Sequence, residues 1–231
     1  TNEDTTYTFT ASDFGFSDVD GDTLSSVTVS ALSGSDGTFL LNGVAITGST
    51  SVTKTQIDSG LLTFVPDSNE NGSSYNTFTF TVNDGTTDSA SSYTMTVNVT
   101  AVNDAPTASN NTVTTNEDTD HTFAASEFGF TDVDGDSLDH VSIETLPSNG
   151  TLLLSGSAVS AGDQISAANI SNLVFRPAAN ANGASYDTFT FTVNDGTTDS
   201  ASSYTMTVNV TAVNDAPTVV NDTDSVTEGG T

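Results

Sequence analysis

The stretch TFTFTVNDGTTDSASSYTMTVNVTAVNDAPT, residues 77–107, recurs without a single change as residues 188–218. In each copy apolar residues alternate with Thr or Asn, in the first copy at Phe78, Phe80 and Val82 and again at Tyr93, Met95, Val97 and Val99. Alternation with a period of two is typical of β-strands that bury one face. The stretch therefore predicts strands, and its recurrence predicts a tandem repeat.

Two further motifs recur outside this stretch. Asn2-Glu3-Asp4 returns at residues 116–118 and the Asp-rich run at residues 18–22 returns at residues 132–136, both at an offset of 114 rather than 111. The difference predicts a three-residue deletion in mid-repeat, at a surface loop. We expect repeat 1 at residues 1–103, with its N-terminus cut short, repeat 2 at 104–217, and the start of a truncated third repeat at 218–231.

Short apolar runs lie between these motifs, and clusters of Gly, Asn, Asp and Ser separate them; examples are residues 27–29, 39–41 and 61–65. This spacing is typical of an all-β sandwich, and no convincing amphipathic helix interrupts it. A chain of 231 residues accommodates two such domains of about 110 residues. The sequence predicts an all-β fold of two tandem Ig-like, Greek-key β-sandwiches in an elongated arrangement.

The composition is extremely acidic. Thirty Asp and Glu face only Lys54 and Arg176, which gives a formal net charge of −28. Such a charge repels phosphate backbones and anionic lipid surfaces, so nucleic-acid binding and membrane insertion are not expected, and the chain is expected to be monomeric. Compaction at this charge calls for bound cations, and without Cys, metal ions are the alternative to disulfides. We expect an extracellular or cell-surface protein.

Three carboxylates stand on alternate residues of a Gly-containing loop in each repeat, as Asp18-x-Asp20-x-Asp22 and as Asp132-x-Asp134-x-Asp136. Hard oxygen ligands in this pattern suit calcium. An EF-hand is excluded because its twelfth position would be Val29 or Ile143 instead of Glu. The alternative is that these residues only shape turns.

The order of motifs resembles a known family. An early Glu, then Asp-x-Asp, then Phe-x-Phe-x-Val-x-Asp-Gly and a terminal Asn-Asp-x-Pro linker are similar to the cadherin repeat, and most of all to the cadherin-like repeats of giant bacterial adhesins secreted by the RTX, type 1 route. The resemblance covers both repeats nearly end to end. It implies cadherin-like sandwiches with calcium at the repeat junction, held by Glu3, Asn103, Asp104, Asp132, Asp134 and Asp195.

The same resemblance implies incomplete sites at the two ends of the chain. Asp18, Asp20 and Asp84 would face a preceding repeat, while Glu117, Asn214 and Asp215 would face the third, and these half-sites are expected to bind more weakly. Ala101 and Ala105 replace family ligands in the linker, so one or two ions per junction are expected.

Catalysis is not expected. His121 and His140 lie near carboxylates, but repeat 1 has Tyr7 and Ser26 in their places, and no Gly-x-Ser-x-Gly elbow occurs. The sequence favours a calcium-stiffened stalk segment of a secreted bacterial adhesin, with calcium and neighbouring repeats as partners, that supports cell adhesion or biofilm attachment. The alternative is a module that recognises a protein or a carbohydrate, such as a cell-surface or matrix polysaccharide.

Overall fold

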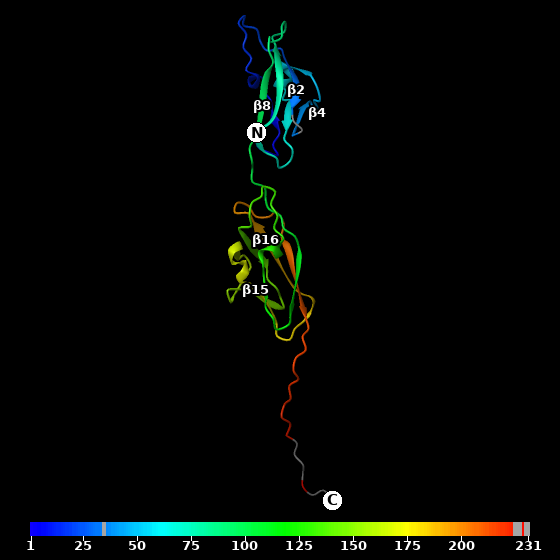
Figure 1. Ribbon diagram of the computed structural model, residues 1–231, viewed down its shortest axis with the longest axis vertical. Coiled ribbons are helices and arrows are strands. Elements are labelled where there is room, and N and C mark those ends of the chain that lie inside the picture. Colours follow the sequence, from blue (N-terminus) through cyan, green and yellow to red (C-terminus); the bar gives the residue numbers. More distant parts are fainter. Residues whose placement is uncertain (34–35, 224–227, 229–231) are drawn as a thin grey trace. The chain divides into compact units, whose positions relative to one another are not determined.

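The computed structural model describes residues 1–33, 36–223 and 228. The chain divides into two units, unit 1 from Thr1 to Asp104 and unit 2 from Ala105 to Thr231. Figure 1 follows the chain through both units, and each unit is described by itself. Of the predicted third repeat, residues 218–223 form neither helix nor strand, and residues 224–227 and 229–231 lie outside the described residues.

Unit 1 consists of two four-stranded sheets in which every strand pair is antiparallel. The first sheet has the order β1 (Tyr7–Thr8), β6 (Leu62–Val65), β3 (Thr38–Leu41), β4 (Val44–Ala45). The second has the order β5 (Thr50–Thr53), β2 (Ser26–Ser33), β7 (Gly72–Asn83), β8 (Tyr93–Val99). Strand β8 therefore forms an edge of the second sheet.

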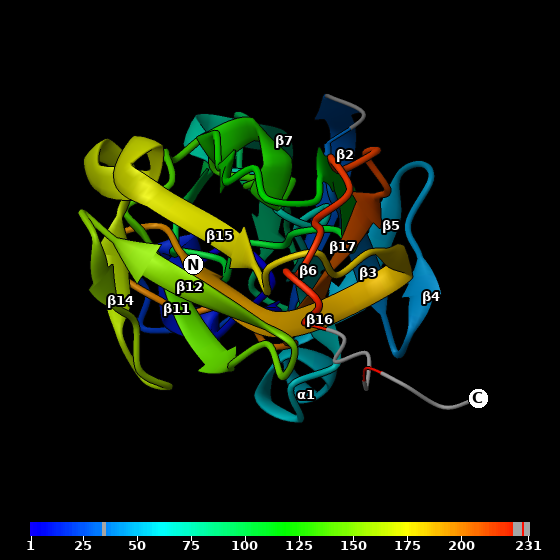
Figure 2. The same ribbon diagram turned by 90° about the horizontal axis from the view of Figure 1, so that it is seen from below.

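Unit 2 repeats this plan with one more strand. Its first sheet has the order β10 (His121–Thr122), β15 (Leu173–Pro177), β12 (Gly150–Leu154), β13 (Ser157–Ala158), and Figure 2 shows β12 beside β15. Its second has the order β14 (Gln164–Ser166), β11 (His140–Thr145), β16 (Gly183–Asn194), β17 (Tyr204–Thr211), β9 (Asn111–Asn116). Strand β9 lies parallel to β17 and covers the edge that corresponds to β8.

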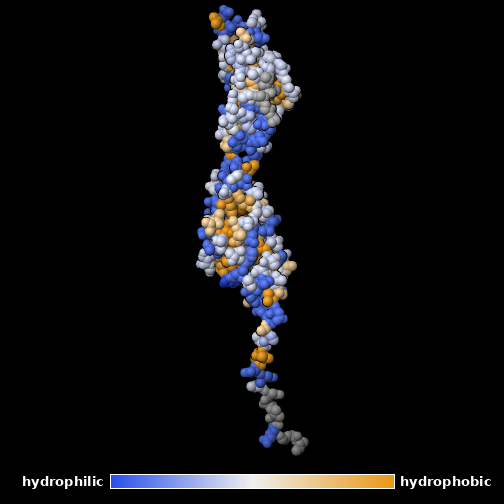
Figure 3. All heavy atoms as spheres, in the orientation of Figure 1, coloured by the Kyte–Doolittle hydropathy of each residue, from blue (hydrophilic) through white to orange (hydrophobic). Residues whose placement is uncertain are grey.

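The inward faces of the two sheets form one hydrophobic core per unit. Phe78 and Phe80 in unit 1 and their counterparts Phe189 and Phe191 in unit 2 are buried, as their alternation predicts. Phe78 meets Phe9 edge to face, with ring centroids 5.7 Å apart. The predicted all-β, Ig-like sandwich is confirmed, while Figure 3 shows mostly hydrophilic residues on the visible surface.

The three-residue length difference is not a single deletion. The offset is 114 between Val27 and Val141, which pair with Val52 and Ile165 at an offset of 113. It falls to 111 at Leu62 and Leu173. One residue is therefore lost between β2 and β5 and two between β5 and β6, where unit 2 makes a tighter helical connection.

Short helical turns connect the strands. They are η1 (Ala11–Phe14) and α1 (Lys54–Asp58) in unit 1, and η2 (Ala125–Phe128) and η3 (Ala167–Asn172) in unit 2. Each helix buries one apolar side chain against its core: Phe14, Ile57, Phe128 and Ile170. Among the described residues, none of these helices has the length and apolar character that a membrane span requires.

Candidate metal centre

The two ends of each unit differ in their chemistry. In unit 2, Asn182 immediately precedes the 12-residue strand β16 and Asp195 immediately follows it, so they lie about 40 Å apart. Asp195 belongs to the end that carries the acidic loop 132–136, because Asp139 N–H donates to the carbonyl of Asn194 over 2.8 Å. We call this end the loop pole. The opposite end, which carries Glu117, is the glutamate pole.

Three carboxylates meet in the acidic loop of unit 2. One oxygen each of Asp132, Asp134 and Asp136 lies within 4.8 Å of the others. Calcium–oxygen distances are about 2.3–2.6 Å, so oxygens up to about 5 Å apart can share one ion. Gly135 permits the tight loop with φ of 84°, and Asp136 N–H donates to Asp132 Oδ1 over 3.0 Å.

Asp132 is the most enclosed carboxylate of this group. The residue is half-buried, whereas Asp134 and Asp136 are exposed. Its Oδ2 atom is buried and accepts no hydrogen bond from the described residues. A buried carboxylate oxygen without a donor is costly, because it loses water and gains nothing in return. The donor set fits a hard divalent cation, which would supply the missing partner.

The acidic loop of unit 1 has the same sequence and turn but a different arrangement of carboxylates. Asp18 Oδ1 accepts the N–H groups of Asp20 and Asp22 over 2.8 and 3.1 Å, and Gly21 has a φ of 86°. Within the part of the chain that the structure describes, the three unit 1 carboxylates do not come together as those of unit 2 do. The better-formed candidate centre is in unit 2.

Asp84 and Asp195 occupy matching Asp-Gly turns at the loop poles. One oxygen of each accepts two backbone N–H groups at 2.6 and 2.7 Å, from Thr86 and Thr87 or from Thr197 and Thr198. The N–H groups of Thr87 and Thr86 lower the pKa of Asp84, so this carboxyl is held in its ionised form. Asp195 is buried, but it is not one of the three carboxylates that meet in the acidic loop.

Glu3 and Glu117 are buried at the glutamate poles, with 2% and 6% of their surface exposed. Glu3 Oε1 accepts the N–H of Val102, and Oε2 accepts Asn71 Nδ2 at 3.2 Å. Glu117 makes the same pair of contacts, with Val213 N at 2.6 Å and Asn182 Nδ2 at 3.0 Å. Each buried carboxylate thus fastens the start of the outgoing linker to its own unit.

Asn71 and Asn182 are the site residues that sequence reasoning omitted. Both were set aside because Asn also shapes turns, and their role depends on a contact with a Glu 65 or more residues away. Their recurrence at an offset of 111 was the available signal. Asp136 was seen in the motif but was not carried into the ligand set.

The linker residues make a local hydrogen bond that is the same in both copies. Asn103 Nδ2 donates to the carbonyl of Asp104 over 2.8 Å, and Asn214 Nδ2 to that of Asp215 over 3.0 Å. Asn103, Asn214 and Asp215 are exposed and Asp104 is half-buried. Their carboxylate and amide oxygens are chemically suited to a hard cation.

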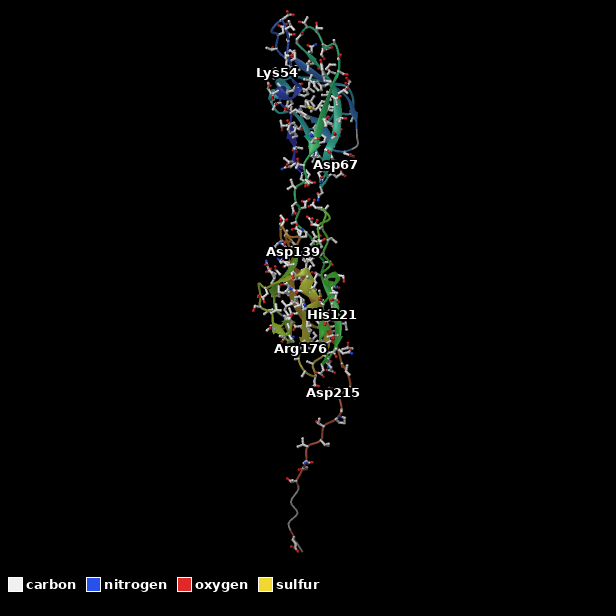
Figure 4. The ribbon with its side chains drawn as sticks, turned by 60° about the vertical axis from the view of Figure 1, so that its left-hand side comes forward. Lys54, Asp67, His121, Asp139, Arg176 and Asp215 are labelled. Carbon is white, nitrogen blue, oxygen red and sulfur yellow. The ribbon has the colours of Figure 1, made fainter. Side chains whose placement is uncertain are left out.

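The two histidines occupy structural positions beside carboxylates. His121 Nε2 lies 3.2 Å from Glu127 Oε2, where unit 1 has the hydroxyl of Tyr7 donating to Asp13 Oδ2 over 3.1 Å. His140 Nδ1 lies 2.8 Å from Asp139 Oδ2. Figure 4 shows Asp139 toward one end of unit 2, with His121 and Arg176 toward the other. The histidines therefore do not converge on one site.

Comparison with known proteins agrees with this fold. Residues 103–211 match the family described as Bacterial Ig domain, which is just under half of the chain and does not single out cadherin-like repeats. No curated protein matches the chain.

Two solved structures illustrate the similarity. An endo-fucoidan hydrolase, MfFcnA4 from glycoside hydrolase family 107, is 18% identical with a TM-score of 0.31; the match covers 84% of this chain and 24% of the hydrolase, so this chain spans about a quarter of its length. Domains 4 and 5 of the S-layer protein SbsC are 19% identical with a TM-score of 0.26, over 85% of this chain and 79% of that one. The chain is thus similar to bacterial Ig domains over residues 103–211.

Proposed function

We propose that this chain is a calcium-binding structural segment of an extracellular bacterial surface protein. The observation that carries the proposal is the meeting of Asp132, Asp134 and Asp136 within 4.8 Å, together with the buried Oδ2 of Asp132 that no described donor reaches. Asp195 at the same pole and Asn103 and Asp104 of the linker are proposed to complete the oxygen shell. Calcium is favoured over softer metals because every candidate ligand is an oxygen.

Calcium would act by removing charge repulsion. Two unit charges about 5 Å apart repel each other by about 1 kcal/mol even in water, and more where solvent is partly excluded. Glu3 and Glu117 already fix the start of each linker to its own unit through the N–H of Val102 or Val213. If calcium joins the other end of the linker to the next loop pole, the linker is restrained from both sides.

A stalk is the role that fits these properties. The net charge of −28 would keep a long array of repeats from collapsing on itself, and calcium outside cells is plentiful enough for modules that bind at about 10⁻⁴–10⁻³ M. The similarity of residues 103–211 to bacterial Ig domains supports an extracellular structural role. We propose that the stalk extends an adhesin and so supports cell adhesion or biofilm attachment.

The test compares two matched double variants by calorimetric titration with calcium. Asp132→Ala with Asp134→Ala removes two carboxylates of the unit 2 loop, and Asp18→Ala with Asp20→Ala removes the same two from the identical unit 1 loop. We expect the unit 2 variant to lose the tightest binding site and the unit 1 variant to keep it. Equal losses in both variants would contradict a site centred on unit 2.

Small-angle scattering on the same proteins tests the mechanical part. In millimolar calcium the unchanged protein and the unit 1 variant should become longer and less flexible than in chelator, and the unit 2 variant should not. Circular dichroism in chelator checks that all three proteins are equally folded. Absence of both heat and a change in dimensions in the unchanged protein would overturn the proposal.

A further inference from the structure

The edge of β8 in unit 1 and the edge of β17 in unit 2 are built from the same residues but are covered differently. In unit 2, β9 runs parallel to β17, with Asn111 opposite Met206 and Val113 opposite Val208. The same register in unit 1 would start opposite Met95. There, the described residues of unit 1 supply only Thr1 and Asn2, which continue the register of Thr115 and Asn116 through a bridge between Asn2 and Thr100.

The uncovered part of the edge is hollow. A cavity of about 270 Å³ lies along β8 at Met95–Asn98, bordered by Phe9 and Asp13. A second cavity of about 360 Å³ follows, lined by aromatic side chains that include Phe16 and Tyr93. Asp13 borders both cavities, so together they form one groove, which we call the β8 groove.

The segment that fills the equivalent path in unit 2 is residues 107–114. Thr107 exchanges two backbone hydrogen bonds of 2.8 Å with Thr131, Ala108 packs on the core, and Val113 is 5% exposed. Asn110 Oδ1 accepts the N–H of Thr205, and Asn111 Nδ2 donates to the carbonyl of Glu127, both over 2.8 Å.

Unit 1 retains the complementary groups for every one of these contacts. Ser17, Asp13 and Thr94 stand where unit 2 has Thr131, Glu127 and Thr205. Gly129 approaches Ser109 so closely that a Cβ there would lie 2.1 Å from the Ser109 hydroxyl, whereas Gly15, with nearly the same φ of 55°, has no atom within 4 Å of that position. Gly15 thus leaves a passage that a neighbouring strand would need.

We propose that the β8 groove binds an extended peptide strand of the kind that residues 107–114 supply to unit 2, aligned parallel to β8. The partner is an uncharged segment with Asn at the positions of Asn110 and Asn111 and an apolar residue at that of Val113. An uncharged strand is favoured because Asp13 borders the groove and the chain carries 30 acidic residues. Strand addition gains main-chain hydrogen bonds along an open edge while side-chain pockets provide specificity. This proposal does not depend on calcium.

The test uses a synthetic peptide with the sequence of residues 107–114, acetylated and amidated, titrated into the whole protein and followed by amide NMR shifts. The expected result is saturable shifts at Met95–Asn98 with none at the identical residues 206–209, whose edge β9 already covers. The result should be the same in chelator and in calcium, which separates this proposal from the calcium stalk. No saturable shift up to millimolar peptide would overturn it.

Two controls decide the chemistry and direction of binding. A peptide with Asp in place of Val113 should bind at least about tenfold more weakly, because burying Val is worth about 1.5–3 kcal/mol. A spin label on the peptide C-terminus should broaden residues near Asn98, and one on the N-terminus should broaden residues near Ser17. Equal affinity for the Asp peptide, or the opposite pattern of broadening, would reject the proposed strand.

A protein variant tests the edge itself. The N–H groups of β8 alternate in direction, and Thr100 N–H points to the open edge because it donates to Thr1 over 2.8 Å, so Thr96 N–H points there too. Thr96→Pro removes this donor, which an edge strand tolerates, and should abolish binding. If this variant fails to fold, the two peptides still decide. A dimer of the unchanged protein that Thr96→Pro dissociates would overturn the proposal in favour of a second copy as the occupant.

Discussion

Strands β8 and β17 have the same sequence and the same place in their sheets, yet they are buried to different extents. Met206 is fully buried, whereas Met95 is half-buried. Tyr204 is half-buried, whereas Tyr93 is 54% exposed. The alternation of residues decides which face of a strand turns inward, but the degree of burial depends on a strand from elsewhere in the chain. Unit 2 is the more completely closed of the two.

A second difference points the same way, and a substitution there should have the largest effect. Asp187 is buried and accepts the N–H groups of Ser148, Asn149 and Gly150 at 2.7–2.9 Å, whereas its counterpart Asn76 makes one hydrogen bond to the carbonyl of Asp36 and one from Thr77. Asp187→Ala leaves several donors unpaired and should lower the free energy of unfolding of unit 2 by about 3 kcal/mol. Hydrogen exchange of the β12 amides measures this loss.

Two variants sharpen the comparison of Asp187 with Asn76. Asn76→Ala should cost about 1 kcal/mol, measured at β3 of unit 1, because fewer hydrogen bonds are lost. Asp187→Asn should fall between the two, since it keeps one acceptor but loses the charge. An equal loss for the two Ala variants would show that the buried carboxylate does not account for the closer packing of unit 2.

The next effect tests the covered edge directly. Thr207 N–H points toward β9, because Thr205 N–H donates to Asn110 at that edge and alternate residues point the same way. Thr207→Pro should therefore release β9 and destabilise unit 2 by about 2 kcal/mol, since a covered strand tolerates Pro poorly. Hydrogen exchange of the β9 amides, Thr112–Thr115, measures the release.

The matched control for Thr207→Pro is Thr96→Pro in the identical strand of unit 1. Because no described strand lies along that part of β8, we expect a loss of under about 1 kcal/mol there. If both substitutions destabilise their units equally, the two edges are equivalent in solution, and the difference in burial between Met95 and Met206 has another origin.

Much of the architecture could be predicted from the sequence. The alternation around Phe78 and Phe80 marked buried faces, and exact recurrence located the second copy. These features depend on local pattern, which acts the same way wherever the strand lies. The split of the length difference between two places was missed, because the sequence alone gives only the total offset and strand pairing is needed to locate each gap.

The candidate centre was predictable only in part. The residues 18–22 and 132–136 have the same sequence, yet the carboxylates meet only in unit 2. The side-chain rotamers of such a loop depend on what surrounds it, so an identical motif does not guarantee an identical site. The bond from Asn71 to Glu3 was hidden for a related reason, since it joins residues that are distant in the sequence.

The smallest effect concerns an ion pair found in unit 2. Arg176 binds Asp120 through Nε and Nη2 at 2.9 and 2.7 Å, and the corresponding residues of unit 1 are Val65 and Thr6. Hydrogen bonding to Arg176 lowers the pKa of Asp120, so the stabilisation it provides is present above the ordinary Asp value of 3.8 and is lost as the pH falls through the lowered pKa. Arg176→Val should destabilise unit 2 less than either preceding substitution, because both partners are exposed to solvent. Thermal unfolding at neutral pH in low salt should detect the change, and 1 M salt or strong acid should remove it; a loss that persists in both conditions would instead indicate packing of the Arg176 alkyl chain.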